Sequence, residues 1–158
     1  MSLHDGAGRV PGLSLTDVSY AQATRYGRTQ ADWDHLLQAG RQFLVEQARM
    51  GRMTSYTELN TVLGQRTSAR VFDFDLDSER AAIGELLGEI VELERPACGH
   101  MISAIVIFLN ENDAGKGFYN LAELNGDLPK GSSRDQRLAF WSKEVTEVHN
   151  HYRSRRRL

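Results

Sequence analysis

Cys98 and His100 are the residues whose types and spacing come closest to a catalytic pair, since they lie two positions apart. An imidazole beside a thiol can take up its proton and leave a nucleophilic thiolate, as in thiol enzymes. No acidic residue is fixed by the sequence to orient the imidazole, and a free cysteine is more often a small buried side chain. A small thiol enzyme using Cys98 and His100 therefore stays an alternative, and we expect no catalytic activity.

Two polar segments could bind ions. In the turn over residues 110–117, Lys116 and backbone donors could hold a phosphate, although a tight turn needs the same Asn, Asp and Gly residues for mechanical reasons. Asp73, Asp75 and Asp77 alternate with apolar residues and could supply carboxylates to a cation, but acidic residues are also favoured before a helix. The simpler interpretation is preferred in both cases, and we expect no metal and no cofactor.

Basic side chains could instead contact the phosphates of DNA. The chain has 19 Lys and Arg against 21 Asp and Glu, with a net charge of -2, so it is no polycation and only a local basic face could bind nucleic acid. The candidates lie near the expected second and third helices, in the polar turn and in the C-terminal tail. They are Arg66, Arg70, Arg80, Lys116, Arg153, Arg155, Arg156 and Arg157.

Length and composition place these candidates in one ordinary domain. The chain has 158 residues, of which 41% are hydrophobic and 25% charged, which excludes collagen-like and wholly disordered classes. Its single cysteine cannot form an intramolecular disulfide. With no apolar run long enough for a bilayer and no signal-peptide pattern, we expect a cytoplasmic protein without membrane contact.

The order of helical and strand signals predicts how the candidates are positioned. Residues 1–29 lack periodicity and predict an extended N-terminal arm, followed by a single α+β domain over residues 30–158. Apolar residues at three- and four-residue steps predict helices, and Ser-x-x-Glu and Ser-x-x-Gln spacings predict capping boxes. The expected elements are helices over 31–52, 55–63, 77–96 and 133–152, a buried strand over 101–109, and a segment over 118–124 that begins as a returning strand or forms a short helix.

This order is that of a winged helix-turn-helix, in which two strands and their turn form a wing beside a recognition helix. We therefore expect a mostly helical α+β fold with a winged-helix-like core, a small antiparallel sheet and a long C-terminal helix. Many small α+β domains share this order, so it indicates a fold more strongly than a function.

Two short segments carry a resemblance to a known family. The stretch from Gly51 to Gly64, with Tyr56, Glu58 and Leu59 in order, resembles the Gly-x-Val-Thr-Thr-Tyr-Gly-Glu-Leu-Ala segment of alkylguanine-DNA alkyltransferases and alkyltransferase-like proteins. Residues 80–84 resemble the Arg-Ala-Val-Gly start of that family's recognition helix, with one extra residue. The resemblance implies DNA binding.

The same family acts through a Pro-Cys-His-Arg box, which this chain replaces with Pro-Ala-Cys98-Gly-His100-Met. The resemblance therefore does not extend to alkyl transfer. A second resemblance, over residues 101–126, is to small uncharacterised bacterial proteins. It supports a fold but implies no activity.

We accordingly expect a nucleic-acid-binding module, with DNA as the partner and without catalytic activity. The alternative is a protein-interaction or regulatory subunit that forms a homodimer through its C-terminal helix. The marker of that alternative is an exposed apolar stripe formed by Leu138, Trp141, Val145 and Val148.

Overall fold

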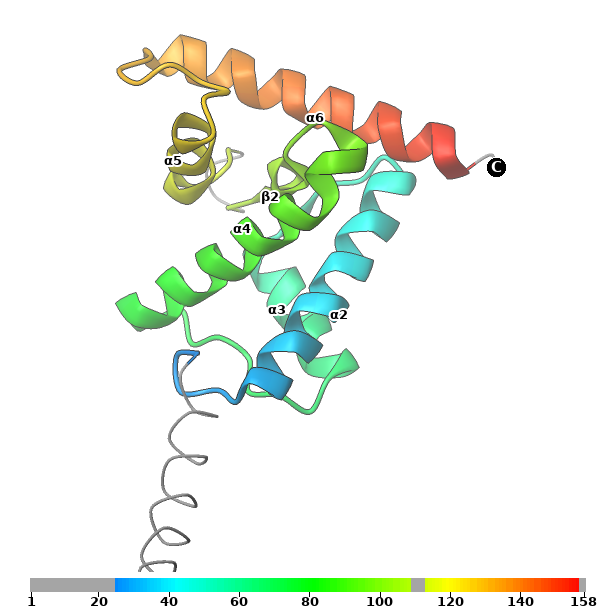
Figure 1. The fold of residues 1–158 in the computed structure, drawn as a ribbon, viewed down its shortest axis with the longest axis vertical. Helices are drawn as coiled ribbons and strands as arrows, with labels where there is room; N and C mark the ends of the chain where they lie inside the picture. The colour runs from blue at the N-terminus through cyan, green and yellow to red at the C-terminus, as the bar shows by residue number, and fades with distance from the viewer. Residues whose placement is uncertain (1–24, 109–112, 157–158) are drawn as a thin grey trace, which may run out of the picture.

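The computed structural model describes residues 25–108 and 113–156, so the expectations for residues 1–24, 109–112 and 157 lie outside the described residues. Figure 1 shows a mostly helical arrangement in which the last helix lies across the ends of two earlier ones. The elements are α2 (Gln30–Arg49), β1 (Thr54–Ser55), α3 (Tyr56–Arg66), α4 (Asp77–Cys98), the 3-10 helix η1 (Ile102–Ile105), β2 (Val106–Ile107), α5 (Lys116–Leu124) and α6 (Arg134–Arg156). A mostly helical chain with a small sheet is confirmed.

Both predicted capping positions begin a helix. The Ser55 hydroxyl accepts the backbone N–H of Glu58 at the start of α3, at 3.0 Å. At the start of α6 the bonds are reciprocal, because Ser133 accepts the N–H of Gln136 at 3.1 Å and donates its own N–H to the Gln136 side chain at 2.8 Å. The Glu58 carboxylate departs from the pattern and accepts the hydroxyl of Thr54 instead.

Helix α4 runs past the proline that was expected to end it. Pro96 lies in its last turn, and the helix ends at Cys98, followed by the C-cap residue Gly99, which has a φ of 76°. A left-handed residue at this position is usually glycine, because a Cβ would be strained there. The N–H of Gly99 donates to the carbonyl of Arg95, so the last turn closes around the proline.

The expected strand over 101–109 is wrong in its first half. Residues Ile102–Ile105 form the 3-10 helix η1, and only Val106 and Ile107 form a strand. The antiparallel sheet is also wrong: Thr54 pairs with Val106 and Ser55 with Ile107 in parallel. Strand β1 has only two residues, so it can pair with only two residues of the apolar run. The residues before them form η1 and bury their side chains without strand hydrogen bonds.

The segment after β2 forms a helix and not a returning strand. One antiparallel bridge joins Phe108 and Asp113, with the N–H of Phe108 donating to the Asp113 carbonyl at 3.2 Å. Helix α5 begins directly afterwards at Lys116, with Gly115 as its N-cap residue.

The core lies between α2, α4, η1 and α6. Gly40 allows α2 and α4 to approach closely, because a Cβ at this position would lie 3.1 Å from the Ile90 side chain. On α6, Val148 is fully buried and the Trp141 side chain donates to the carbonyl of Ala104 at 2.8 Å. Helix α6 is therefore part of the core.

A buried ion pair fixes the start of the described chain to α4. Arg28 is 2% exposed and Glu79 is 4% exposed. The two Nη atoms of Arg28 donate to the two carboxylate oxygens of Glu79 at 3.0 and 2.8 Å. Arg28 also donates to the carbonyls of Tyr26, Arg70 and Val71, so its guanidinium is fully hydrogen-bonded.

Candidate functional site

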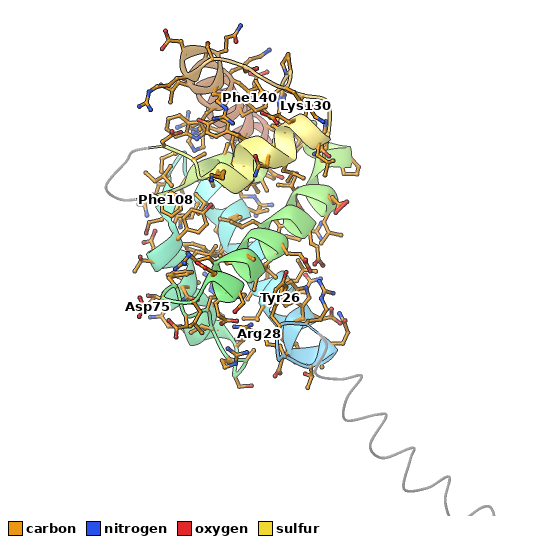
Figure 2. All side chains as sticks on the ribbon, turned by 90° about the vertical axis from the view of Figure 1, so that its left-hand side faces the viewer. Tyr26, Arg28, Asp75, Phe108, Lys130 and Phe140 are labelled. Carbon is orange, nitrogen blue, oxygen red and sulfur yellow. The ribbon has the colours of Figure 1, made fainter. Side chains whose placement is uncertain are left out.

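A pocket of about 430 Å³ opens where the first turns of α3 and α5 meet the N-terminal half of α4. This volume lies in the range of small-ligand sites. Figure 2 looks at this side of the molecule, with Phe108 between α5 and the connection that carries Asp75. The pocket is lined by Tyr56, Thr57, Phe74, Arg80, Ile83, Gly84, Phe108, Gly115, Lys116 and Gly117.

Aromatic rings form one wall of this pocket. Tyr56 and Phe108 are stacked, with ring centroids 4.6 Å apart and an interplanar angle of 26°. Phe108 is 41% exposed, which is high for a large apolar side chain, and Phe74 is half-buried nearby in the lining. Exposed rings beside a pocket favour a flat, apolar-faced ligand.

Gly115 makes this stacking possible. A Cβ at this position would lie 2.7 Å from Cε2 of Phe108 and 3.0 Å from the hydroxyl oxygen of Tyr56. The backbone thus approaches the two rings as closely as only a glycine allows. The apolar pattern predicted that Phe108 belongs to a buried strand and gave no sign of this contact, although the residue stands two positions before the polar turn.

Two of the predicted basic residues lie at this pocket. Lys116 is exposed at the start of α5 and has no ion pair with any described residue. Arg80, on α4, donates to the carbonyl of Phe74 and to the carboxylate of Asp77. The pocket therefore combines aromatic walls with two cations.

Arg66 and Arg70 are engaged elsewhere. Arg66 pairs with Glu46 on α2 at 2.8 Å, and this guanidinium holds the pKa of the Glu46 carboxyl below its usual value. Arg70 pairs with the buried Glu79 at 3.0 Å. Arg66 thus joins α3 to α2, Arg70 joins the α3–α4 connection to α4, and neither lines the pocket.

The C-terminal arginines lie on or beyond α6. The guanidinium of Arg153 lies against Gly51, so close that a Cβ there would be 1.8 Å from Nη2. Arg155 and Arg156 belong to α6, and Arg157 lies outside the described residues. Of the eight predicted residues, Arg80 and Lys116 are the two whose described side chains line the same pocket.

Cys98 and His100 do not form an activated pair. Burial raises the pKa of the Cys98 thiol, and hydrogen bonds from the His100 backbone and the Tyr152 hydroxyl offset this only in part. The imidazole faces α6: its Nδ1 lies 2.7 Å from Glu144 and its Nε2 lies 3.6 Å from Glu147. Both ring nitrogens are thus directed to carboxylates, and the thiol stays protonated at neutral pH.

The Cys98 thiol should therefore react slowly with an alkylating agent. At neutral pH we expect iodoacetamide to modify the folded protein at least about tenfold more slowly than the urea-unfolded chain, because burial removes both access and thiolate. Mass spectrometry over a time course measures this rate. Labelling faster than in the unfolded chain would restore the thiol-enzyme hypothesis.

The apolar stripe on α6 packs within the chain. Val148 is buried, Leu138, Trp141 and Val145 are half-buried, and the last two pack against the core. The marker for a dimer through this helix is thus absent from the described residues.

The acidic and turn residues form local hydrogen bonds. Asp73 accepts the N–H of Asp75 at 3.0 Å, and Asp113 accepts the Tyr119 hydroxyl at 2.6 Å. The described residues contain no group of three or more His, Cys, Asp or Glu side chains suited to hold a metal ion.

Comparison with protein-family models, with curated proteins and with solved structures gave no match. Within the described ranges, none of the helices combines the length and the apolar composition needed to cross a bilayer.

Proposed function

We propose that this protein binds nucleic acid and takes one unstacked base into the pocket between α3, α4 and α5. The main support for the proposal is one pocket lining that combines a stacked aromatic pair, the half-buried Tyr56 and the exposed Phe108, with the cations of Arg80 and Lys116. Bases that are not paired in a duplex stack on aromatic side chains, while nearby cations contact the backbone phosphates.

The shape of the pocket suits a single unpaired base better than the groove of a duplex. Its lining is mainly apolar, with Ile83 and three rings, and its volume of about 430 Å³ suits one nucleotide unit. A helix that reads a major groove presents polar side chains on a convex surface, whereas this site is concave. A single-stranded or locally unpaired segment is therefore the preferred partner.

The sequence resemblance supports the same site. Tyr56 stands in the segment that resembles the DNA-binding half of alkyltransferase-like proteins, and Arg80 and Gly84 stand in the segment that resembles its recognition helix. All three residues line the pocket. In this proposal α2, α3 and α4 form a winged-helix-like core, and the bridge between Phe108 and Asp113 takes the place of the strand pair of the wing.

No thiol lines the pocket, because Cys98 lies at the far end of α4 from Arg80. The proposed function is therefore binding without thiol chemistry on the base.

Replacing Lys116 with alanine should weaken binding of a fluorescein-labelled, random-sequence 12-mer of single-stranded DNA. We expect affinity to fall about two- to fivefold at low salt, because one phosphate contact is lost. The slope of log K against log salt concentration should fall by about 0.7. Fluorescence anisotropy across a salt series measures both quantities.

Lys143→Ala is the matched control, since Lys143 is an exposed lysine on α6 outside the pocket lining. It should leave the affinity and the slope near those of the wild type. Absence of binding at low salt, or equal losses for the two variants, would overturn the proposal.

A further inference from the structure

A small chamber adjoins the aromatic pocket and shares Tyr56, Gly84 and Gly117 with its lining. It has a volume of about 20 Å³ and reaches Ser103 in η1. A cavity of this size holds about one water-sized atom. It therefore extends the pocket by the space of a single polar atom.

Ser103 is buried at this chamber with its hydrogen-bonding capacity unused. The residue is 6% exposed, and its hydroxyl forms no hydrogen bond with any described group. The Tyr56 hydroxyl is likewise without a hydrogen-bond partner among the described residues. Neither hydroxyl oxygen is fully enclosed, because Nε of Arg137 is the fully buried side-chain polar atom that lacks a partner among the described residues. Both hydroxyls can therefore bond to a group that enters the chamber.

The backbone N–H groups beside the chamber can only donate. Helix α5 begins at Lys116 without a side-chain cap, so the N–H groups of Lys116 and Gly117 have no intrahelical acceptor. Gly117 lines the chamber, and the helix dipole adds partial positive charge at this end. Burial raises the pKa of Tyr56 to about 12, so its hydroxyl keeps its proton at neutral pH.

We infer that the chamber receives the keto oxygen at C4 of a pyrimidine, or at C6 of a purine, whose base stacks on the outer face of the Tyr56–Phe108 ring pair. The site then prefers bases that carry a carbonyl at the inserted edge, such as uracil, over bases that carry an amino group there, such as cytosine. A keto oxygen accepts from both hydroxyls and from a backbone N–H, whereas an amino group would face that N–H with a second donor. The chamber has no room for an alkyl group on the oxygen. This inference depends on the proposed function, and it names the class of base.

The test compares two labelled oligonucleotides with the same backbone, (dU)10 and (dC)10, on the full chain at neutral pH. We expect (dU)10 to bind about three- to tenfold more tightly, which is the effect of about one neutral hydrogen bond. Ser103→Ala and Tyr56→Phe should each weaken (dU)10 binding and bring the ratio of the two affinities toward one. Tyr56→Phe keeps the stacked ring, so stacking is retained.

Ser142→Ala, an exposed serine on α6, is the matched control and should leave the ratio unchanged. Equal affinities of the wild type for the two oligonucleotides, or a ratio insensitive to Ser103→Ala, would overturn the keto preference and leave the binding function standing. If neither oligonucleotide binds at low salt, the proposed function fails and this inference fails with it.

Discussion

Replacing Glu79 with glutamine should lower the free energy of unfolding by about 3–5 kcal/mol, which is the usual effect of leaving one buried charge without its partner. Arg28, which is 2% exposed, would then face a neutral amide. Arg70, which pairs with the same carboxylate, would also lose its partner. Urea denaturation followed by circular dichroism measures the change.

The matched control is Glu85→Gln, on the same helix. Glu85 pairs with Arg25 at 3.0 Å, but its side chain is 46% exposed, and such exposed pairs contribute less than about 1 kcal/mol. Equal losses for the two variants would show that burial of the Arg28–Glu79 pair does not govern its contribution.

The same pair predicts how stability depends on pH. Hydrogen bonds from Arg28 lower the pKa of Glu79, although burial opposes this shift. The folded pKa therefore lies below the unfolded value, and the stabilisation is fully present above that unfolded value of about 4.3. It is lost as the pH falls through the folded pKa. The difference in unfolding free energy between wild type and Glu79→Gln should thus shrink below about pH 4, and a constant difference would contradict this assignment.

The helices could be predicted because their signals are local. Apolar residues on α2 recur at helical steps from Trp33 to Ala48, and these positions are buried in the fold. Ser55 and Ser133 begin helices because a hydroxyl there satisfies a backbone N–H that the helix leaves free. Neither signal requires knowledge of the rest of the chain.

The segment at η1 could not be assigned in the same way. Ile102 to Ile107 is a short apolar run rich in β-branched residues, and such a run has the same pattern in a buried strand and in a buried helical turn. The length of the strand available for pairing decides which of these two structures forms. Thr54 and Ser55 offer only two residues for pairing, and they precede the run by about 50 positions. Neither the pairing nor its parallel direction has a signal in the local sequence.

The candidate site was predicted in part. Tyr56, Arg80 and Lys116 stand in segments that the sequence singled out, because helix beginnings and a polar turn are visible in it. Their meeting at one pocket depends on how α3, α4 and α5 pack. The Arg28–Glu79 pair joins residues 51 positions apart and has no local signal at all.

Replacing Gly115 with alanine should weaken binding of single-stranded DNA about 5- to 150-fold, corresponding to the 1–3 kcal/mol of roughly one base stacked on an aromatic side chain. The added methyl group would lie 2.7 Å from the Phe108 ring, so the ring must leave its position on Tyr56. Stability should change little, because Gly115 has a φ of -77° that alanine adopts without strain. Fluorescence anisotropy measures the affinity, and urea denaturation measures the stability.

A double-mutant cycle with Phe108→Ala separates this mechanism from a general disturbance of α5. If Gly115→Ala acts by displacing the Phe108 ring, the double variant binds no more weakly than Phe108→Ala alone, because the ring is already gone. If the two losses add, the methyl group acts through another contact and the stacked pair is not what holds the base. If Gly115→Ala bound single-stranded DNA with wild-type affinity, displacement of the Phe108 ring would not affect binding. The pocket would then not be the binding site.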